Sequence, residues 1–245
     1  VSLRSLFEHP RLEDFAAQVH ALRHAANACE RPALVADHSG DRQPLSFAQQ
    51  RLWFLWNLEP DSSMYNMPGA LRLRGELNLS ALQQTFETLV QRHAVLRTTF
   101  HEEDGQAWQR VHAELPLNFV ASDLRHLPAP DVEAAQLARE EVAQPFDLRN
   151  GPLLRVRVLQ VADQEHVLLL TVHHIAADDW SFRILINEFV TLYPTFNQGG
   201  VAQLPEHAVQ YADFAKWQRQ WLEQGGELQR QLDYWVARLG QPQTV

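Results

Sequence analysis

The chain has 245 residues, 45% of them hydrophobic, which is enough to bury the core of one large domain or two small ones. Its formal net charge of -9 argues against a nucleic-acid-binding surface, and it has no run of about 18 apolar residues that could cross a membrane. The single cysteine, Cys29, excludes a disulfide framework and is typical of a reducing, cytoplasmic compartment.

The N-terminal part is expected to be helical and then irregular. Apolar residues recur at helical spacing over residues 1–28, and Pro10 interrupts them, so two short helices are predicted there. Residues 29–44 lack periodicity and contain Pro, Gly, Asp and Ser, which predicts a linker. The chain begins Val-Ser-Leu-Arg and ends Gln-Thr-Val, so we expect it to be a piece of a longer protein.

The next segments predict alternating helices and strands. Ser46 is placed to cap a helix that carries Trp53 and Trp56. Alternating apolar residues over 67–75 predict a strand. A second helix is then predicted from apolar residues on one face, namely Leu79, Leu82, Phe86, Leu89 and Val90. After it, a hairpin is predicted from strands at 96–101 and 107–111.

The second half repeats this alternation. A helix is predicted at 131–144, then two strong strands at 153–161 and 166–173 around a short turn. Helices are expected from about Trp180 and over 207–224 and 226–239. Interleaved helices and strands without a glycine-rich phosphate loop predict an α/β layered domain that lacks a nucleotide site.

The most informative segment follows the strand 166–173 and reads His173-His174-Ile-Ala-Ala-Asp178-Asp-Trp-Ser181. A loop at a strand exit is held by a rigid scaffold, and histidine suits proton transfer near neutral pH. Successive strand residues point to opposite faces, so one imidazole is expected at a site and the other in the core. This arrangement disfavours a metal site built from the pair. Two interpretations of the histidine pair stay open: one histidine acts as a general base, or both are hydrogen-bonded residues that cap the strand.

Asp178 also has two readings. It can cap the following helix, or it can form a buried ion pair that holds the loop, with Arg97 or Arg155 as the partner. The chain has no G-x-S-x-G nucleophile elbow. A histidine base without a protein nucleophile favours direct transfer between two bound substrates.

These residues carry a family resemblance. The segment HHIAADDWS resembles the HHxxxDG motif of condensation domains in nonribosomal peptide synthetases. Three further segments resemble other motifs of that family in the same order, namely LSFAQQRLWFL (45–55), RHAVLRTTF (92–100) and YADFAKWQ (211–218). Residues 1–20 are similar to the last helices of a peptidyl carrier domain. The resemblance therefore implies carrier-domain helices at 1–28, a linker at 29–44 and a condensation domain at 45–245.

The resemblance implies a chloramphenicol-acetyltransferase-like α/β fold of two lobes, of which this chain supplies the N-terminal lobe. It implies peptide-bond formation, in which an acyl or peptidyl thioester on a donor carrier is transferred to the α-amine of an amino acid on an acceptor carrier. The expected partners are those two carrier domains, the C-terminal lobe and an adjacent adenylation domain. No cofactor is expected on the chain itself, because the phosphopantetheine arms belong to the carriers.

Roles for individual residues also follow from the resemblance. His174 matches the histidine that deprotonates or positions the attacking amine, and His173 matches its supporting neighbour. Asp178 matches the motif aspartate that an arginine holds, with Arg97 as the first choice of partner and Arg155 as the second.

The positions after Asp178 are expected to line the substrate channel, namely Asp179, Trp180 and Ser181. Asp179 departs from the motif, which usually has glycine there. Glycine suits a positive φ and close approach of substrate, and aspartate tolerates a left-handed backbone better than most residues.

Two other functions stay open. An epimerization domain is suggested by the segment 181–185, although the intact segment 45–55 argues against it. A noncatalytic relative that only docks carrier domains or a partner protein is suggested by Asp179 and by the missing second lobe.

Overall fold

The structure is a computed structural model, and it describes residues 5, 11–26, 32–37, 40–224 and 226–240. The chain divides into two compact units, one of residues 34–219 and one of residues 1–33 with 220–245. The second unit contributes the helix α2 (Leu12–Ala26), the π-helical turn η2 (Gln220–Gln224) and the helix α8 (Glu227–Leu239). Of the two helices predicted over 1–28, α2 is confirmed, and the other falls almost wholly outside the described residues.

The larger sheet has four strands in the order β2-β7-β6-β5. The predicted pair of strong strands is confirmed as the antiparallel hairpin of β6 (Leu154–Ala162) and β7 (Glu165–His173). On the far side of β7 lies β2 (Asn66–Arg74), which was also expected. The strand β5 (Asn118–Asp123) was not predicted, and it pairs in parallel with β6.

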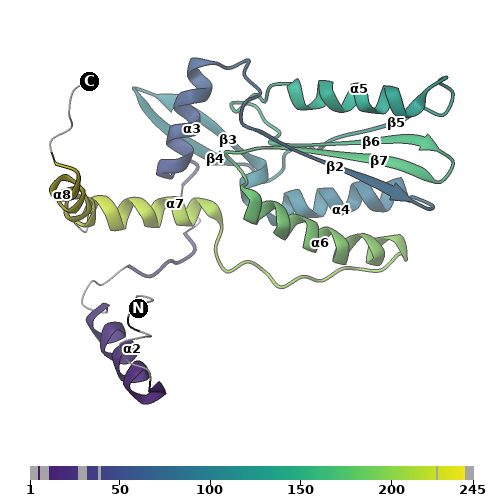
Figure 1. Ribbon diagram of the computed structural model, residues 1–245. Helices are drawn as coiled ribbons and strands as arrows, with labels where there is room; N and C mark the ends of the chain where they lie inside the picture. Colours follow the sequence, from purple (N-terminus) through teal and green to yellow (C-terminus); the bar gives the residue numbers. More distant parts are fainter. Residues whose placement is uncertain (1–4, 6–10, 27–31, 38–39, 225, 241–245) are drawn as a thin grey trace. The chain divides into compact units, whose positions relative to one another are not determined.

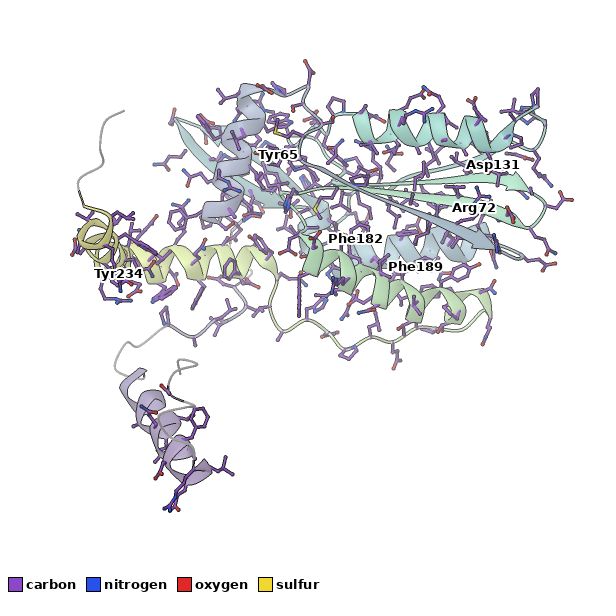
Figure 2. The ribbon with its side chains drawn as sticks, in the orientation of Figure 1. Tyr65, Arg72, Asp131, Phe182, Phe189 and Tyr234 are labelled. Atoms are coloured by element: carbon purple, nitrogen blue, oxygen red, sulfur yellow. The ribbon has the colours of Figure 1, made fainter. Side chains whose placement is uncertain are left out.

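Helices cover both faces of this sheet (Figure 1). The helices α4 (Leu79–Arg92) and α6 (Asp179–Asn197) pack on one face, and α5 (Pro130–Ala143) packs on the other. Phe182 and Phe189 of α6 pack against the core on the first face (Figure 2). Because both faces are covered, the central strand β7 is apolar along most of its length rather than alternating.

A smaller sheet of three strands lies beside the helix α3 (Phe47–Leu58) and has the order β1-β4-β3. Its strands are β1 (Gln43–Pro44), β3 (Thr98–Glu103) and β4 (Gln106–Val111). The prediction that the linker extends to residue 44 is wrong at its end, because Gln43 and Pro44 pair with β4. The predicted strand at 96–101 begins later, at Thr98, since residues 94–97 form the 3-10 turn η1 (Ala94–Arg97).

The remaining helix of the larger unit is α7 (Tyr211–Arg219), which begins four residues after the predicted start at 207 and is continued by the π-helical turn η2 to Gln224, the predicted end. The predicted cap of α3 is confirmed, since Ser46 and Gln49 form a capping box in which each side chain accepts from the other's backbone N–H. Among the residues described, no helix has both the length and the apolar character needed to cross a bilayer.

Candidate active site

The segment 173–178, which joins the end of β7 to α6, is called the histidine loop here. Backbone hydrogen bonds hold its start on both sides. The N–H of His173 donates to the carbonyl oxygen of Leu153 at 3.1 Å, and the N–H of His174 donates to that of Tyr65 at 2.9 Å. Leu153 immediately precedes β6 and Tyr65 immediately precedes β2, so both neighbouring strands fix the start of the loop. Sequence reasoning missed Tyr65, because only the pairing of β2 with β7 brings it to this place.

The two histidines face different surroundings, as expected from strand alternation. The side chain of His173 is buried, with the residue only 3% exposed, and its Nδ1 accepts a hydrogen bond from the N–H of Ile175 at 3.1 Å. The ring of Phe146 meets it edge-on at 5.8 Å between centroids. Burial, followed by the nearby His174 and Arg155, lowers the pKa of His173 to about 4. His173 is therefore neutral at physiological pH.

The free energy of unfolding is expected to fall by about 3 kcal/mol as the pH drops from 6.5 to about 4, because of His173 alone. The unfolded chain binds this proton below pH 6.5 while the folded chain resists it, so the stabilisation is complete above pH 6.5 and is lost as the pH falls. Urea unfolding at several pH values should show the loss as a difference between the native protein and His173→Gln. Parallel pH profiles for the two proteins would contradict the assignment.

His174 is exposed and its tautomer is fixed. Its Nδ1 lies 2.7 Å from the carbonyl oxygen of Ala177, and a carbonyl can only accept a hydrogen bond, so Nδ1 carries the proton. In the neutral ring the other nitrogen, Nε2, then has the free lone pair. The side chain borders an open depression of about 520 Å³, whose other lining residues are Asp178, Asp179, Trp180 and Arg183. A nitrogen that can accept a proton thus stands beside space for a substrate.

Asp178 is the N-cap of α6, and it forms no ion pair with another residue in the part of the chain that the structure describes. Its Oδ1 accepts hydrogen bonds from the N–H and the Oγ–H of Ser181, at 2.8 and 2.6 Å. The hydrogen bond from the Ser181 hydroxyl, and after it the bond from the Ser181 N–H, lowers the pKa of Asp178.

The expected ion pair of Asp178 with Arg97 or Arg155 is wrong for the described structure. Arg155 binds Glu141 at 2.6 Å, and Arg97 donates to the carbonyl of His112. Both arginines are therefore engaged elsewhere.

Substitution of Asp178 by alanine should cost about 0.5–2 kcal/mol of stability, because the first turn of α6 loses its cap. Asp178→Asn retains a cap oxygen and should cost much less. Thermal unfolding of both variants tests this, and equal losses for the two would contradict the capping role.

Of the three residues predicted to line the channel, Asp179 and Trp180 border the depression, whereas Ser181 lines a different pocket of about 200 Å³. Asp179 is the first residue of α6, and Asp104 is the one non-glycine residue in the described part with a positive φ. The glycine-like backbone considered for Asp179 is therefore absent. Trp180 is 75% exposed. Sequence reasoning missed Arg183, although its spacing of four residues from Asp179 places both on one side of a helix.

The four segments with family resemblance meet in the structure. Ser46 at the start of α3 lies 3.0 Å from the hydroxyl of Tyr211 in α7, and the N–H of Phe47 donates to the side chain of Gln218 at 3.0 Å. Ile175 of the histidine loop packs in the same core cluster as Trp53 and Trp56 of α3. The second segment is joined through Gln210, whose side chain accepts from the N–H of Ala94 and donates to the carbonyl of Arg92.

Comparison with known proteins gives consistent results. Residues 39–245 match the family model described as "Condensation domain". The chain is 44% identical over 242 residues to one of the linear gramicidin synthase proteins of Brevibacillus parabrevis, covering 98% of this chain and 3% of that protein. The X-domain solved in a complex with OxyB from teicoplanin biosynthesis is 33% identical, with a TM-score of 0.74, and the match covers 87% of this chain and 46% of that chain.

The fold is shared with more distant structures. The starter condensation domain of rhizomide synthetase has a TM-score of 0.74 at 21% identity, over 82% of this chain and 49% of that chain. The chain thus spans slightly less than half of the solved domains that it matches and a small fraction of the gramicidin synthase protein.

Proposed function

The chain belongs to the condensation-domain family, and on that premise we propose that it supplies one wall of an amide-forming site with His174 as the base. The α-amine of an acceptor amino acid attacks the thioester carbonyl of the donor. A C–N bond forms, the C–S bond breaks, and the donor's phosphopantetheine thiol leaves. His174 accepts the amine proton at Nε2 and can return it to the departing sulfur.

The observation that carries this proposal is the hydrogen bond from Nδ1 of His174 to the carbonyl of Ala177. In the neutral imidazole it makes Nε2 the nitrogen with the free lone pair, on an exposed loop whose backbone is held by the flanks of β6 and β2. Orienting two tethered substrates can supply about 7–11 kcal/mol of the barrier. A positioned base adds about 10²–10⁴-fold in rate.

The other residues of the loop have supporting roles in this proposal. Neutral His173 packs the base of the loop through Phe146. Asp178 acts as a positioning residue by capping α6, and Asp179, Trp180 and Ser181 border the channel through which a substrate arrives. Arg155 and Arg97 act further away, by holding the segments around the loop.

The expected partners complete the site. Donor and acceptor carrier domains would bring phosphopantetheine arms, the C-terminal lobe would form the opposite wall, and an adenylation domain would load the acceptor. Residues 1–28 would be the end of a preceding carrier domain, and the residues after them would connect it to the N-terminal lobe, which includes the strand β1 at Gln43–Pro44.

The proposal is tested by a condensation assay on the intact protein. Donor and acceptor amino acids are loaded on their carriers, and the acceptor carrier is analysed by intact-mass spectrometry for the dipeptidyl thioester. An acceptor whose amine is acetylated serves as the control, because it lacks the nucleophile. Carriers that bind while no amide forms would contradict the proposal.

One comparison favours a second function, the docking of a partner protein without catalysis. The X-domain, 33% identical to this chain, is solved in a complex with OxyB. The same assay separates the two functions, since a docking domain gives no amide. It also identifies an epimerization domain, which would invert the donor α-carbon without joining the amino acids, a change detected by chiral chromatography of the hydrolysed donor.

A further inference from the structure

A second histidine cluster lies outside the proposed active site. His93 is the C-cap residue of α4, Glu188 is in the middle of α6, and His207 is in the segment that connects α6 to α7. Nε2 of His93 lies 2.6 Å from Oε2 of Glu188, and Nε2 of His207 lies 3.7 Å from Oε1 of the same carboxylate. The two imidazole rings are 4.9 Å apart between centroids.

We propose that His93, Glu188 and His207 bind a divalent transition-metal ion, with Zn²⁺ as the best match. Two imidazoles and one carboxylate are a common set of protein ligands for zinc, with a fourth position left for water. The ligand atoms of the three side chains all lie within 4.8 Å of one another. Tetrahedral coordination at about 2.0–2.1 Å from the metal places ligand atoms about 3.3 Å apart. Small side-chain movements therefore suffice.

The surroundings suit these ligands. The side chains of Glu188, His93 and His207 are 12%, 17% and 32% exposed, so the cluster is partly desolvated and still reachable from water. Hollows of about 200 and 680 Å³ adjoin it, and His207 lines both.

The directions of the pKa shifts of Glu188 and His207 agree with metal binding. Burial alone would raise the pKa of Glu188, but hydrogen bonds from His93 and Arg92 lower it overall, so the carboxylate is charged. Burial, then the charges of Arg92 and His93, lower the pKa of His207, whereas the charge of Glu188 acts in the opposite direction. A neutral imidazole and an ionised carboxylate are the forms that bind metal.

Arg92 lies next to the proposed metal site, and its positive charge opposes the binding of a cation. Nε of Arg92 donates to Oε1 of Glu188 at 2.9 Å, which orients the carboxylate but adds a positive charge. Substitution of Arg92 by glutamine should therefore tighten metal binding.

A bound ion would join the connecting segment to the α4–α6 pair. That segment leads directly to Gln210, which already contacts the carbonyl of Arg92. The site would thus stabilise the entry to α7 and has a structural role, independent of amide formation.

The test is calorimetric titration of ZnCl₂ into the intact protein after removal of metals with a chelator. We expect a zinc site whose affinity falls by about 10-fold or more in His207→Ala and in Glu188→Gln. His126→Ala is the matched control, since His126 is an exposed turn residue outside the cluster. Zinc should also raise the melting temperature of the native protein and of His126→Ala, but not that of His207→Ala.

His207 is the most exposed of the three ligands, so His207→Ala should fold even if Glu188→Gln does not, and circular dichroism checks this. Zinc binding that is equal in the native protein, His207→Ala and His126→Ala would overturn the proposal. So would the absence of any binding to the native protein. Neither outcome bears on the condensation assay, which needs no zinc.

Discussion

Replacing His174 with alanine is expected to lower the rate of amide formation by about 10²–10⁴-fold without unfolding the protein. The side chain is exposed, and the backbone bonds that hold the loop run through main-chain atoms that the substitution retains. The one side-chain bond lost, from Nδ1 to the carbonyl of Ala177, is worth about 1 kcal/mol. The effect should therefore appear in the rate and hardly in stability.

Single-turnover kinetics with both carriers loaded is the suitable measurement, because it separates chemistry from product release. His126→Ala removes an exposed imidazole elsewhere and should leave the rate unchanged. If His174→Ala forms product at the native rate, proton transfer to this residue is not required. Catalysis would then rest on the positioning of the two tethered substrates.

Replacing Arg155 with methionine is expected to lower the free energy of unfolding by about 3–5 kcal/mol. Arg155 and Glu141 are both buried, with the two side chains only 6% and 7% exposed, so the substitution leaves a carboxylate without its partner in the core. The guanidinium also donates to the carbonyls of Glu141, Gln144 and Pro145 at the end of α5, which lose these donors.

Urea unfolding should compare this variant with Arg72→Met. Arg72 binds Asp131 and Glu165 at the surface, where all three side chains are partly or largely exposed, so its loss should cost far less than that of Arg155 (Figure 2). The double substitution Arg155→Met with Glu141→Leu should recover much of the stability, since it removes the stranded charge. Equal losses for Arg155→Met and Arg72→Met would show that burial does not strengthen the first pair.

The Arg155 guanidinium also lies 3.8 Å from the ring centroid of Phe146, the ring that meets His173 edge-on. Loss of Arg155 should thus loosen the packing beneath the histidine loop as well as the end of α5.

The sequence was sufficient for those parts of the fold that depend on local pattern. The apolar runs of β6 and β7, the capping residue Ser46 and the helix that follows the histidine loop are all present as predicted. The strand β5 was missed because it lies at the edge of the sheet and most of its residues are exposed or half-buried, so it has no strong apolar signal.

The contacts of the candidate site were not predictable from the sequence. Capping and ion pairing were equally compatible with Asp178, and the choice depends on where Arg155 ends after folding. The tautomer of His174 depends on a turn that brings the carbonyl of Ala177 to Nδ1. The partner of Arg155 is Glu141 on a different element, and spacing along the chain does not indicate that contact.

In the histidine loop, the contacts that hold the proposed base are separate from the side chains that border the depression. Neighbouring strands fix His173 and His174 through main-chain bonds, whereas Trp180 and Arg183 contribute exposed side chains to the rim. If His174 is the base, as proposed, mutation at the rim would change which substrate is accepted without moving the base. Such a division lets a lineage explore new substrates by single substitutions while the chemistry is inherited unchanged.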